Sequence, residues 1–316
     1  KSKRDGLPKM VLIGDIVGDD PDAVATAASE VVRLANGRSG EGFVAVSAEA
    51  RKKFWADRSR TAAIARHTNA FKINEDVVIP LRRMGEYTEE IERINIELST
   101  DNKLRLTREL EDFLQGDLPV GKIEDHSDAE HTREEILDER RHDALQIVRS
   151  VRQRWQWLQD NLDKPLKDSQ ADLAEIGVPL DSAAIEARLQ EDPTTSIFQL
   201  LQDHTIRTSW KSEIRENLEH IFPGADCAAV LTELQAIHDR VLKSRVFVAL
   251  HMHAGDGNVH TNIPVNSDDY GMLQQANVTV ARIMQIARGL DGVISGEHGI
   301  GLTKYEFLTQ EELDPF

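Results

Sequence analysis

His251-Met-His-Ala-Gly-Asp-Gly-Asn-Val-His260 places three histidines and an Asp-Gly turn signal within ten residues. The pair Asp256-Gly257 is typical of the centre of a two-residue hairpin turn, because glycine tolerates the positive φ that such turns need. It follows the β-prone run Val246-Phe-Val-Ala-Leu250. The sequence therefore predicts a β-hairpin with strands at 246–253 and 258–265.

This turn gives an expected register for the hairpin. His253 would face His260 across the two strands, and His251 would face Asn262. Side chains alternate along a strand, so all four belong to one face. Directly opposed residues have Cβ atoms roughly 4.5–5.5 Å apart, which lets two imidazoles hold one metal ion. A single strand histidine is usually an ordinary surface or core residue, but three on one face indicate a site.

A second segment, Ser295-Gly-Glu-His-Gly-Ile-Gly301, supplies a carboxylate and another imidazole. Its small residues let the backbone pass close to a ligand. Glu297 would complete a set of two histidines and one carboxylate with open positions, which suits a catalytic metal better than a closed structural one. We expect one divalent ion on His253, His260 and Glu297, with zinc preferred over manganese or iron. Neither glycine cluster has the spacing of a dinucleotide-binding fingerprint.

Composition limits the possible classes of protein. The 316 residues allow one large domain or two modest ones. A formal net charge of −17 opposes binding to nucleic acid or to an anionic membrane, and an anionic substrate would need a local Arg or Lys. The single Cys227 excludes an intrachain disulfide and a cysteine-ligated iron–sulfur cluster within this chain. No apolar run approaches the roughly 20 residues of a transmembrane helix.

The first residues, Lys-Ser-Lys-Arg, do not form a convincing signal peptide, because aspartates interrupt the apolar run after them. The chain also begins without methionine, as expected for a piece of a longer protein. We expect a cytoplasmic location, and the parent enzyme could be peripheral to the inner membrane.

Periodicity divides the two ends of the chain into short elements. We expect an α+β fold in which helices cover one face of an antiparallel sheet. Besides the hairpin, the expected strands are Val11–Ile16, Phe43–Val46 and Ile73–Ile79, and the expected helices are Asp22–Asn36, Ser47 to about Arg66 and Tyr270–Gly289.

The middle of the chain, residues 85–244, has almost no strand signal and predicts a large all-helical insertion. Its charge runs are typical of solvated helix faces rather than of binding sites. A helical hairpin of this kind could dock another domain of a parent enzyme. The expected helices are Glu89–Gln115, Ala129–Leu162, Asp181–Gln190, Ser196–Gln202, Thr208–His220 and Ala225–Lys243.

The two motif segments and a third region together resemble one protein family. The third region contains Phe54-Trp-Ala-Asp-Arg58 and Lys72-Ile-Asn-Glu-Asp-Val-Val-Ile-Pro80, which are similar to a tryptophan-x-x-arginine helix followed by an aspartate-to-proline strand. Over residues 8–84 and 245–310 the chain resembles the C-terminal substrate domain of FAD-linked oxidases in the vanillyl-alcohol-oxidase superfamily. The branch of this superfamily that the chain resembles contains D-lactate, glycolate and D-2-hydroxyglutarate dehydrogenases. Within it, the chain is most similar to the very large bacterial D-2-hydroxyglutarate type.

This resemblance implies a ferredoxin-like antiparallel sheet. Residues 1–84 and 245–316 would form the substrate and metal domain, with 85–244 as the insertion. The FAD-binding and iron–sulfur domains would be absent from this chain and would belong to the same parent polypeptide. FAD would therefore be held mainly by another domain, and an iron–sulfur cluster would occur only in the parent protein.

The implied reaction is oxidation of a small D-2-hydroxy acid, such as D-2-hydroxyglutarate or D-lactate, to the 2-oxo acid, with hydride passing to FAD. Arg58 matches the family's arginine and would clamp the substrate carboxylate, since a guanidinium is a forked, permanently charged donor. Lys72 is a second candidate, because the spacing is about one residue longer than usual. The metal would act as a Lewis acid, His298 would accept the hydroxyl proton as general base, and Asn262 would hydrogen-bond the substrate.

Two other functions fit the same residues. A metal-dependent hydrolase could use two histidines and a glutamate around zinc, with His298 as the proton shuttle. Alternatively, the chain could be a noncatalytic docking module, which the long helical region favours. Flavin binding by the parent protein separates the oxidoreductase from the hydrolase, and a site that binds no metal would favour the docking module.

Overall fold

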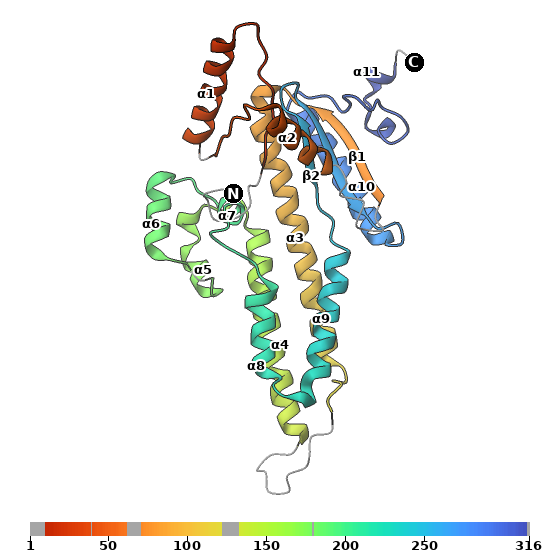
Figure 1. Ribbon diagram of the computed structural model, residues 1–316. Coiled ribbons are helices and arrows are strands. Elements are labelled where there is room, and N and C mark those ends of the chain that lie inside the picture. Colours follow the sequence, from red (N-terminus) through yellow and green to blue (C-terminus); the bar gives the residue numbers. More distant parts are fainter. Residues whose placement is uncertain (1–9, 39, 62–70, 122–132, 179, 315–316) are drawn as a thin grey trace. The chain divides into compact units, whose positions relative to one another are not determined.

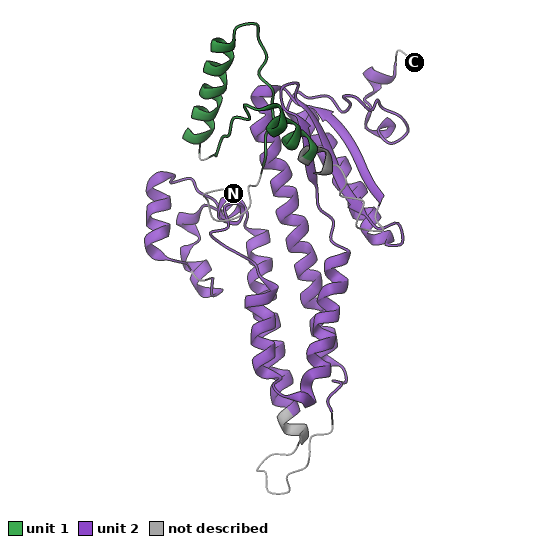
Figure 2. Ribbon diagram, viewed as in Figure 1, with its two compact units in different colours: residues 1–68 green, residues 69–316 purple. Residues whose placement is uncertain are grey.

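The computed structural model describes residues 10–38, 40–61, 71–121, 133–178 and 180–314 (Figure 1). The chain divides into two compact units, residues 1–68 and residues 69–316 (Figure 2). In the described residues, the first unit contains helices α1 and α2, and the second contains a sheet and the later helices.

The first unit confirms its predicted helices and corrects its predicted strands. Helix α1 spans Pro21–Gly37, where Asp20 caps the first turn by accepting a hydrogen bond from the Asp22 N–H. Helix α2 spans Ala48–Thr61, and the rest of the predicted helix, to about Arg66, lies outside the described residues. The predicted strands at 11–16 and 43–46 are wrong, because neither segment is paired as a strand among the described residues. An apolar run becomes a strand only where another backbone accepts its hydrogen bonds.

The second unit contains a three-stranded antiparallel sheet. Strand β1 spans Phe71–Val78, β2 spans Ala249–His253 and β3 spans Asn258–Val265. Their order is β1-β3-β2, so β3 is central and hydrogen-bonds to both neighbours. The predicted strand at 73–79 and the predicted hairpin are confirmed. The strand at 258–265 has its predicted bounds, whereas the one predicted at 246–253 begins at Ala249.

The hairpin register differs from the predicted one by two residues. His251 faces His260, His253 faces Asn258, and Ala249 faces Asn262. The connection is therefore the four-residue loop 254–257 rather than a two-residue Asp-Gly turn. Because side chains alternate with a period of two, a two-residue shift keeps every side chain on its predicted face.

The two faces of the sheet have opposite character. One face is apolar and packs against helix α10, Tyr270–Gly289, and the first half of helix α3, Met84–Gln115. This core contains strand residues Val77, Val259, Ile263 and Val265, together with α10 residues Ala276, Ile283 and Ala287 and α3 residues Tyr87, Ile91 and Ile94. The bounds of α10 match the prediction, and helices on one face of the sheet are confirmed.

The helices between the sheet strands form two further packed groups. Helices α3, α4, α8 and α9 run side by side in Figure 1 around a second core that includes Leu110, Trp155, Leu218 and Leu234. A third core lies under α5, α6 and α7. The bounds are α4 Arg133–Asp160, α5 Gln170–Glu175, α6 Ser182–Glu191, α7 Ile197–Gln202, α8 Glu216–Ile221, α9 Ala228–Lys243 and α11 Gln310–Leu313, with a π-helix at Trp210–Arg215 and short 3-10 turns at Leu81–Arg83, Leu166–Asp168, Ala225–Cys227 and Tyr305–Phe307.

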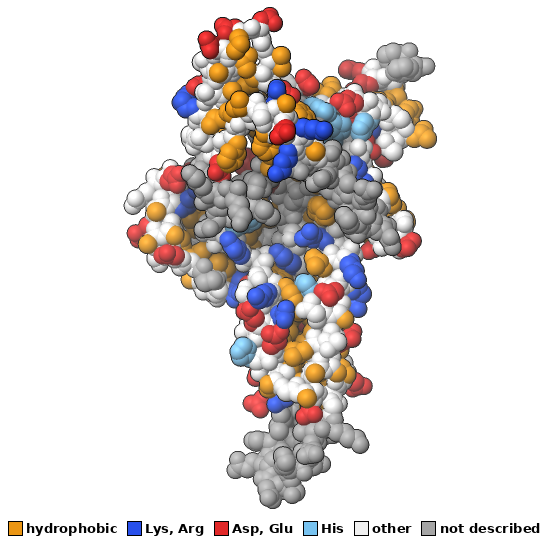
Figure 3. Space-filling model, in the orientation of Figure 1, with side chains coloured by type: hydrophobic (Ala, Val, Ile, Leu, Met, Phe, Trp, Pro, Cys, Tyr) orange, Lys and Arg blue, Asp and Glu red, His pale blue; other side chains and the backbone are white. Residues whose placement is uncertain are grey.

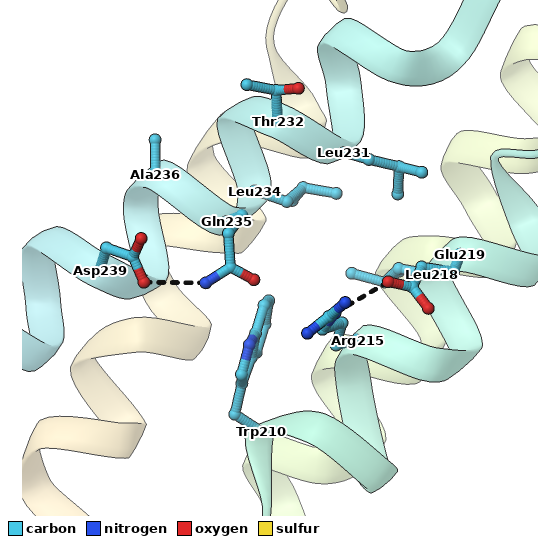
Figure 4. A pocket seen from close by; sticks show the side chains of 10 residues that line it. All are labelled: Trp210, Arg215, Leu218, Glu219, Leu231, Thr232, Leu234, Gln235, Ala236 and Asp239. Carbon is cyan, nitrogen blue, oxygen red and sulfur yellow. Dashed lines mark hydrogen bonds and ion pairs between the residues drawn. The ribbon is translucent and has the colours of Figure 1, made fainter. Parts of the chain in front are cut away.

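A hollow of about 460 Å³ lies among these helices, between α8 and α9 (Figure 4). Its Trp210 indole stacks on the ring of His238, with ring centroids 4.8 Å apart. It contains none of the predicted site residues, and it is lined by Trp210, Arg215, Leu218, Glu219, Leu231, Thr232, Leu234, Gln235, Ala236 and Asp239.

These elements make a mixed fold, rich in helices, with a small antiparallel sheet, which is compatible with the α+β class. The ferredoxin-like topology and the insertion at 85–244 stay predictions. None of the described helices is long and apolar enough to cross a membrane.

Candidate metal centre and active site

The polar face of the sheet carries the candidate site. Residues directly opposed in antiparallel strands share a face, so the pairs Asp76–His260 and His251–His260 place one residue from each strand together. His253 lies two residues from His251 and belongs to the same face. The visible surface in Figure 3 shows histidine side chains gathered over the upper end of the sheet.

Three side chains on this face form a set that could hold a metal ion. The Nε2 of His253 lies 3.6 Å from Oε1 of Glu297, and the Nε2 of His260 lies 3.7 Å from Oε2 of the same carboxylate. The donor atoms of the three residues all lie within 4.8 Å of one another. Two ligands of a tetrahedral zinc ion, each about 2.0–2.1 Å from the metal, are separated by roughly 3.4 Å. The observed spacing therefore fits one small divalent ion.

The burial of these ligands differs in a way that leaves the site open. The side chain of His260 is 10% exposed, whereas those of His253 and Glu297 are 40% and 58% exposed. Burial lowers the pKa of His260, although the nearby Glu297 carboxylate acts in the opposite direction. The neutral imidazole is the form that binds a metal. A ligand can thus approach from the side of His253 and Glu297.

A second group, Asp76, His260 and His298, also has donor atoms within 4.8 Å of one another, but its carboxylate is already occupied. Oδ2 of Asp76 accepts hydrogen bonds from the backbone N–H groups of Gly296, Glu297 and His298, and Oδ1 accepts one from Nζ of Lys304. A carboxylate has about four acceptor positions. We therefore assign the metal ligands to the group containing Glu297.

The same hydrogen bonds determine the charge of Asp76. Burial alone would raise its pKa, but the hydrogen bonds from Lys304 and from the His298 and Glu297 N–H groups, together with the Lys304 charge, lower it to about 2. Asp76 is thus an ionised carboxylate with no exposed surface.

Two buried polar atoms next to the turn that carries Glu297 have no hydrogen-bond partner among the described residues: Asn258 Oδ1 and Ser295 Oγ. Asn258 faces His253 across the hairpin, and Ser295 precedes the turn that carries Glu297. Buried polar atoms are normally hydrogen-bonded, so unpaired ones grouped at one place fit a site that binds a polar ligand.

The structure brings most of the predicted site residues together. His298 lies beside His260, with ring centroids 5.1 Å apart, and its Nδ1 lies 3.8 Å from Oδ1 of Asp76. Asn262 is buried on the same face and donates to the Ala249 carbonyl. Lys72 also lies on this face, opposite Pro264. It is four residues along β1 from Asp76, which corresponds to roughly 13 Å between Cα atoms.

The structure does not place Arg58 relative to this group. It belongs to helix α2 in the first unit, and its side chain lies outside the described part of the structure. Its assignment as the carboxylate clamp stays a prediction.

Two residues of the site were missed from the sequence, Asp76 and Lys304. Asp76 continues an every-second-residue polar pattern with Lys72 and Asn74, which marks one face of the strand as polar. That pattern could have found it. Lys304 has no local signal, because its partner Asp76 is more than two hundred residues away in the sequence.

The chain was compared with known proteins. Residues 6–107 and 209–314, more than half of the chain, match the model of the FAD linked oxidases, C-terminal domain, family. The unmatched part between these two segments, 108–208, is narrower than the predicted insertion at 85–244.

Curated relatives match shorter segments. The chain is 39% identical over 59 residues to a probable mitochondrial D-lactate dehydrogenase of Danio rerio, covering 19% of this chain and 12% of that protein. It is 32% identical over 75 residues to glycolate oxidase subunit GlcD of Bacillus subtilis, covering 24% and 16%. It is 31% identical over 78 residues to the mitochondrial D-lactate dehydrogenase [cytochrome] of Kluyveromyces lactis, covering 25% and 13%.

The matched segments thus span less than a fifth of the length of these relatives. No solved structure gives a significant match. From the extent of the family match, the chain belongs to the family of C-terminal domains of FAD-linked oxidases.

Proposed function

We propose that this chain is the substrate- and metal-binding domain of a flavin-dependent dehydrogenase that oxidises a small D-2-hydroxy acid to the 2-oxo acid. The observation that carries the proposal is the open group of His253, His260 and Glu297 with His298 directly beside it. The family is one of FAD-linked oxidases, and two of its named relatives act on D-lactate and glycolate, which are both 2-hydroxy acids.

The metal site would be formed by three side chains of this chain. His253 and His260 would each supply a neutral imidazole nitrogen, and Glu297 would supply a carboxylate oxygen. A divalent ion held there would supply Lewis-acid chemistry that lowers the pKa of a hydroxyl group on the substrate. The mixed nitrogen and oxygen donor set suits zinc, with manganese or iron as alternatives.

His298 would hold the proton that the substrate hydroxyl loses. The oxidation removes this proton together with a hydride from Cα, and the two electrons of the hydride reduce FAD held by another domain. The His298 ring lies against the His260 ring and is part exposed, with its Nδ1 facing the Asp76 carboxylate. An imidazole between a carboxylate and the ligand side of the site is a suitable general base.

The remaining polar residues would bind the substrate. The chain carries a net charge of −17, so an anionic substrate must find its attraction locally. Lys72 lies on the same face of the sheet and Arg58 is the predicted forked clamp for the carboxylate. The buried Asn262 would hydrogen-bond the substrate from β3. The proposal includes the predicted resemblance to the large bacterial D-2-hydroxyglutarate type.

The proposal is tested on the full-length parent protein with its flavin. The D and L forms of lactate and 2-hydroxyglutarate, and glycolate, are each added anaerobically while flavin absorbance and dye reduction are recorded. We expect bleaching with at least one D-2-hydroxy acid and none with its L form. Absence of bleaching by every one of these acids, in a preparation whose flavin dithionite still reduces, would contradict the proposal.

A further inference from the structure

The turn that carries Glu297 and His298 is attached to the sheet through a single carboxylate. Three consecutive backbone N–H groups, those of Gly296, Glu297 and His298, donate to the same oxygen, Oδ2 of Asp76. The Gly296 and His298 contacts are each 3.0 Å long. Successive N–H groups that converge on one point form an anion-binding concavity. Here the anion is a side chain of β1.

Lys304 secures Asp76 from the other side. Its Nζ lies 2.5 Å from Oδ1 of Asp76 and 2.8 Å from the Asp76 carbonyl oxygen, and the whole side chain is 1% exposed. That carbonyl lies on the edge of β1 away from β3, where no strand pairs with it among the described residues. Nearby on the same edge, Val78 pairs with Val293. Residues 293–304 therefore follow the free edge of β1 and are anchored at both ends.

Neither charge can be buried without the other. A carboxylate or ammonium taken out of water costs several kcal/mol unless it is paired and fully hydrogen-bonded. Asp76 and Lys304 meet both conditions, and Glu75 adds a second carboxylate 3.6 Å from Nζ. The pair can form only if residues 296–304 lie against β1, so the interaction selects one position for this turn.

The turn also needs glycine at 296. A Cβ atom there would lie 2.6 Å from Oδ1 of Asn258 and 3.0 Å from Oδ2 of Asp76. A side chain at 296 would therefore force the Asn258 amide to move, and it would also crowd the Asp76 carboxylate. Glycine at 296 lets the backbone come close enough for its N–H groups to donate to Asp76. The same hydrogen bonds orient Glu297 and His298.

We propose that the buried Asp76–Lys304 pair positions the metal ligand Glu297 and the base His298, and is a functional part of the active site. Asp76 is outside the proposed ligand set. It holds the backbone N–H groups of both residues, and its Oδ1 also lies 3.8 Å from Nδ1 of His298. The consequence for catalysis rests on the function proposed above. The positioning of the turn does not rest on that function, because it follows from contacts within this chain.

The alternative is that the pair only stabilises the fold, so the test compares it with a buried ionic group elsewhere. Glu111 of α3 is 7% exposed and lies within ion-pair distance of Arg149 and Arg152, far from the sheet residues in the sequence. Glu111→Gln serves as the matched control. The test variants are Asp76→Ala and the double variant Asp76→Ala with Lys304→Met, which leaves no unpaired buried charge.

The experiments use the full-length protein at a temperature where each variant is folded, and the unfolding temperature of each variant is recorded as well. Hydrogen exchange of the peptide containing residues 296–298 reports the turn, and the chelator concentration that removes half the bound zinc reports metal affinity. The kcat and KM for the substrate are measured at saturating zinc. For the double variant we expect faster exchange in this peptide, a metal affinity lower by roughly 10–100-fold, and a lower kcat with little change in KM.

Glu111→Gln is expected to lower the unfolding temperature without changing the other quantities. A folded double variant with wild-type exchange, zinc affinity and kcat would overturn the proposal. If the wild-type protein binds no zinc, the proposed metal site is wrong. The exchange of residues 296–298 then decides the positioning role by itself, and faster exchange in the variant supports it.

Discussion

His251 lies directly opposite His260 in the hairpin, yet it is His253, two residues further along β2, that shares the Glu297 carboxylate with His260. The ring centroids of His253 and His260 are 5.5 Å apart and those of His251 and His260 are 6.0 Å apart. Ring proximity alone therefore does not distinguish the two candidates. The position of Glu297 does, and it selects the diagonal pair as ligands.

The hairpin loop should depend on glycine at 257. Its φ is +74°, and a Cβ atom there would lie 2.2 Å from the carbonyl oxygen of Ile79, whose own N–H donates to the Gly257 carbonyl. We expect Gly257→Ala to lower the free energy of unfolding by on the order of 1–3 kcal/mol. Gly255→Ala is the control, because nothing lies within 4 Å of a Cβ atom there. Denaturant unfolding of the two variants gives the comparison, and equal midpoints would contradict it.

Removal of the proposed base should separate chemistry from metal binding. We expect His298→Ala to lower kcat of the parent enzyme by on the order of 10²–10⁴-fold while the metal content stays unchanged, because His298 is outside the ligand group. His220→Ala in α8 removes an exposed histidine of the helical region and should be silent. Steady-state kinetics give kcat and elemental analysis gives the metal content of both variants. A His298→Ala enzyme of normal kcat would exclude this residue as the base.

The carboxylate clamp is tested with a change that keeps the charge. Arg58→Lys should raise KM by on the order of tenfold, because lysine cannot reproduce the forked contact. A tenfold change corresponds to the loss of about one charged hydrogen bond. Arg60→Lys on the same helix is the control and should have nearly wild-type KM. If Arg60 proves critical and Arg58 dispensable, the assigned position of the clamp on this helix is wrong.

Lys103 of α3 predicts a pH effect on stability away from the site. Its ammonium donates to Thr208, and burial lowers its pKa to about 8, with Glu213 acting in the opposite direction. The folded protein therefore loses this proton before the unfolded chain does, whose lysine has a pKa near 10.5. Burying Lys103 is unfavourable below pH 8, and this cost disappears as the pH rises from about 8 to 10.5.

The measurement is the unfolding free energy of wild type minus that of Lys103→Met as a function of pH. We expect this difference to become more positive, so that the wild type gains stability relative to the variant, between about pH 8 and pH 10.5. Lys211→Met, at a lysine side chain that is 74% exposed, is the control for general effects of alkaline pH. A difference that is constant from pH 7 to 10.5 would show that Lys103 is not desolvated.

Part of the fold and site could be predicted because the signals were local. The alternation of His251, His253 and His260 identified one face of a hairpin, and that result survives a two-residue error in register. The error arose because an Asp-Gly pair is also compatible with a longer loop, and only the docking of Gly257 on Ile79 distinguishes them. Helices such as α1 and α10 were predictable because their caps and periodicity lie within the element.

The rest depends on contacts between distant parts of the chain. The predicted strands at 11–16 and 43–46 had suitable residues, but strand formation requires a partner that local sequence does not reveal. The role of Asp76 required knowing that residues 296–304 return to the free edge of β1. The alternating polar pattern of β1 marks Asp76 as polar, but no pattern in either segment shows that Lys304 is its partner.

Metal content of the full-length enzyme tests the central claim most directly. His253→Ala, His260→Ala and His251→Ala are purified in parallel with the wild type, and bound divalent metal is measured per chain. We predict about one ion per chain in the wild type and in His251→Ala, and loss of that ion in His253→Ala and His260→Ala. Full metal content in His260→Ala, or loss of metal in His251→Ala together with retention in His253→Ala, would contradict the assigned ligand set.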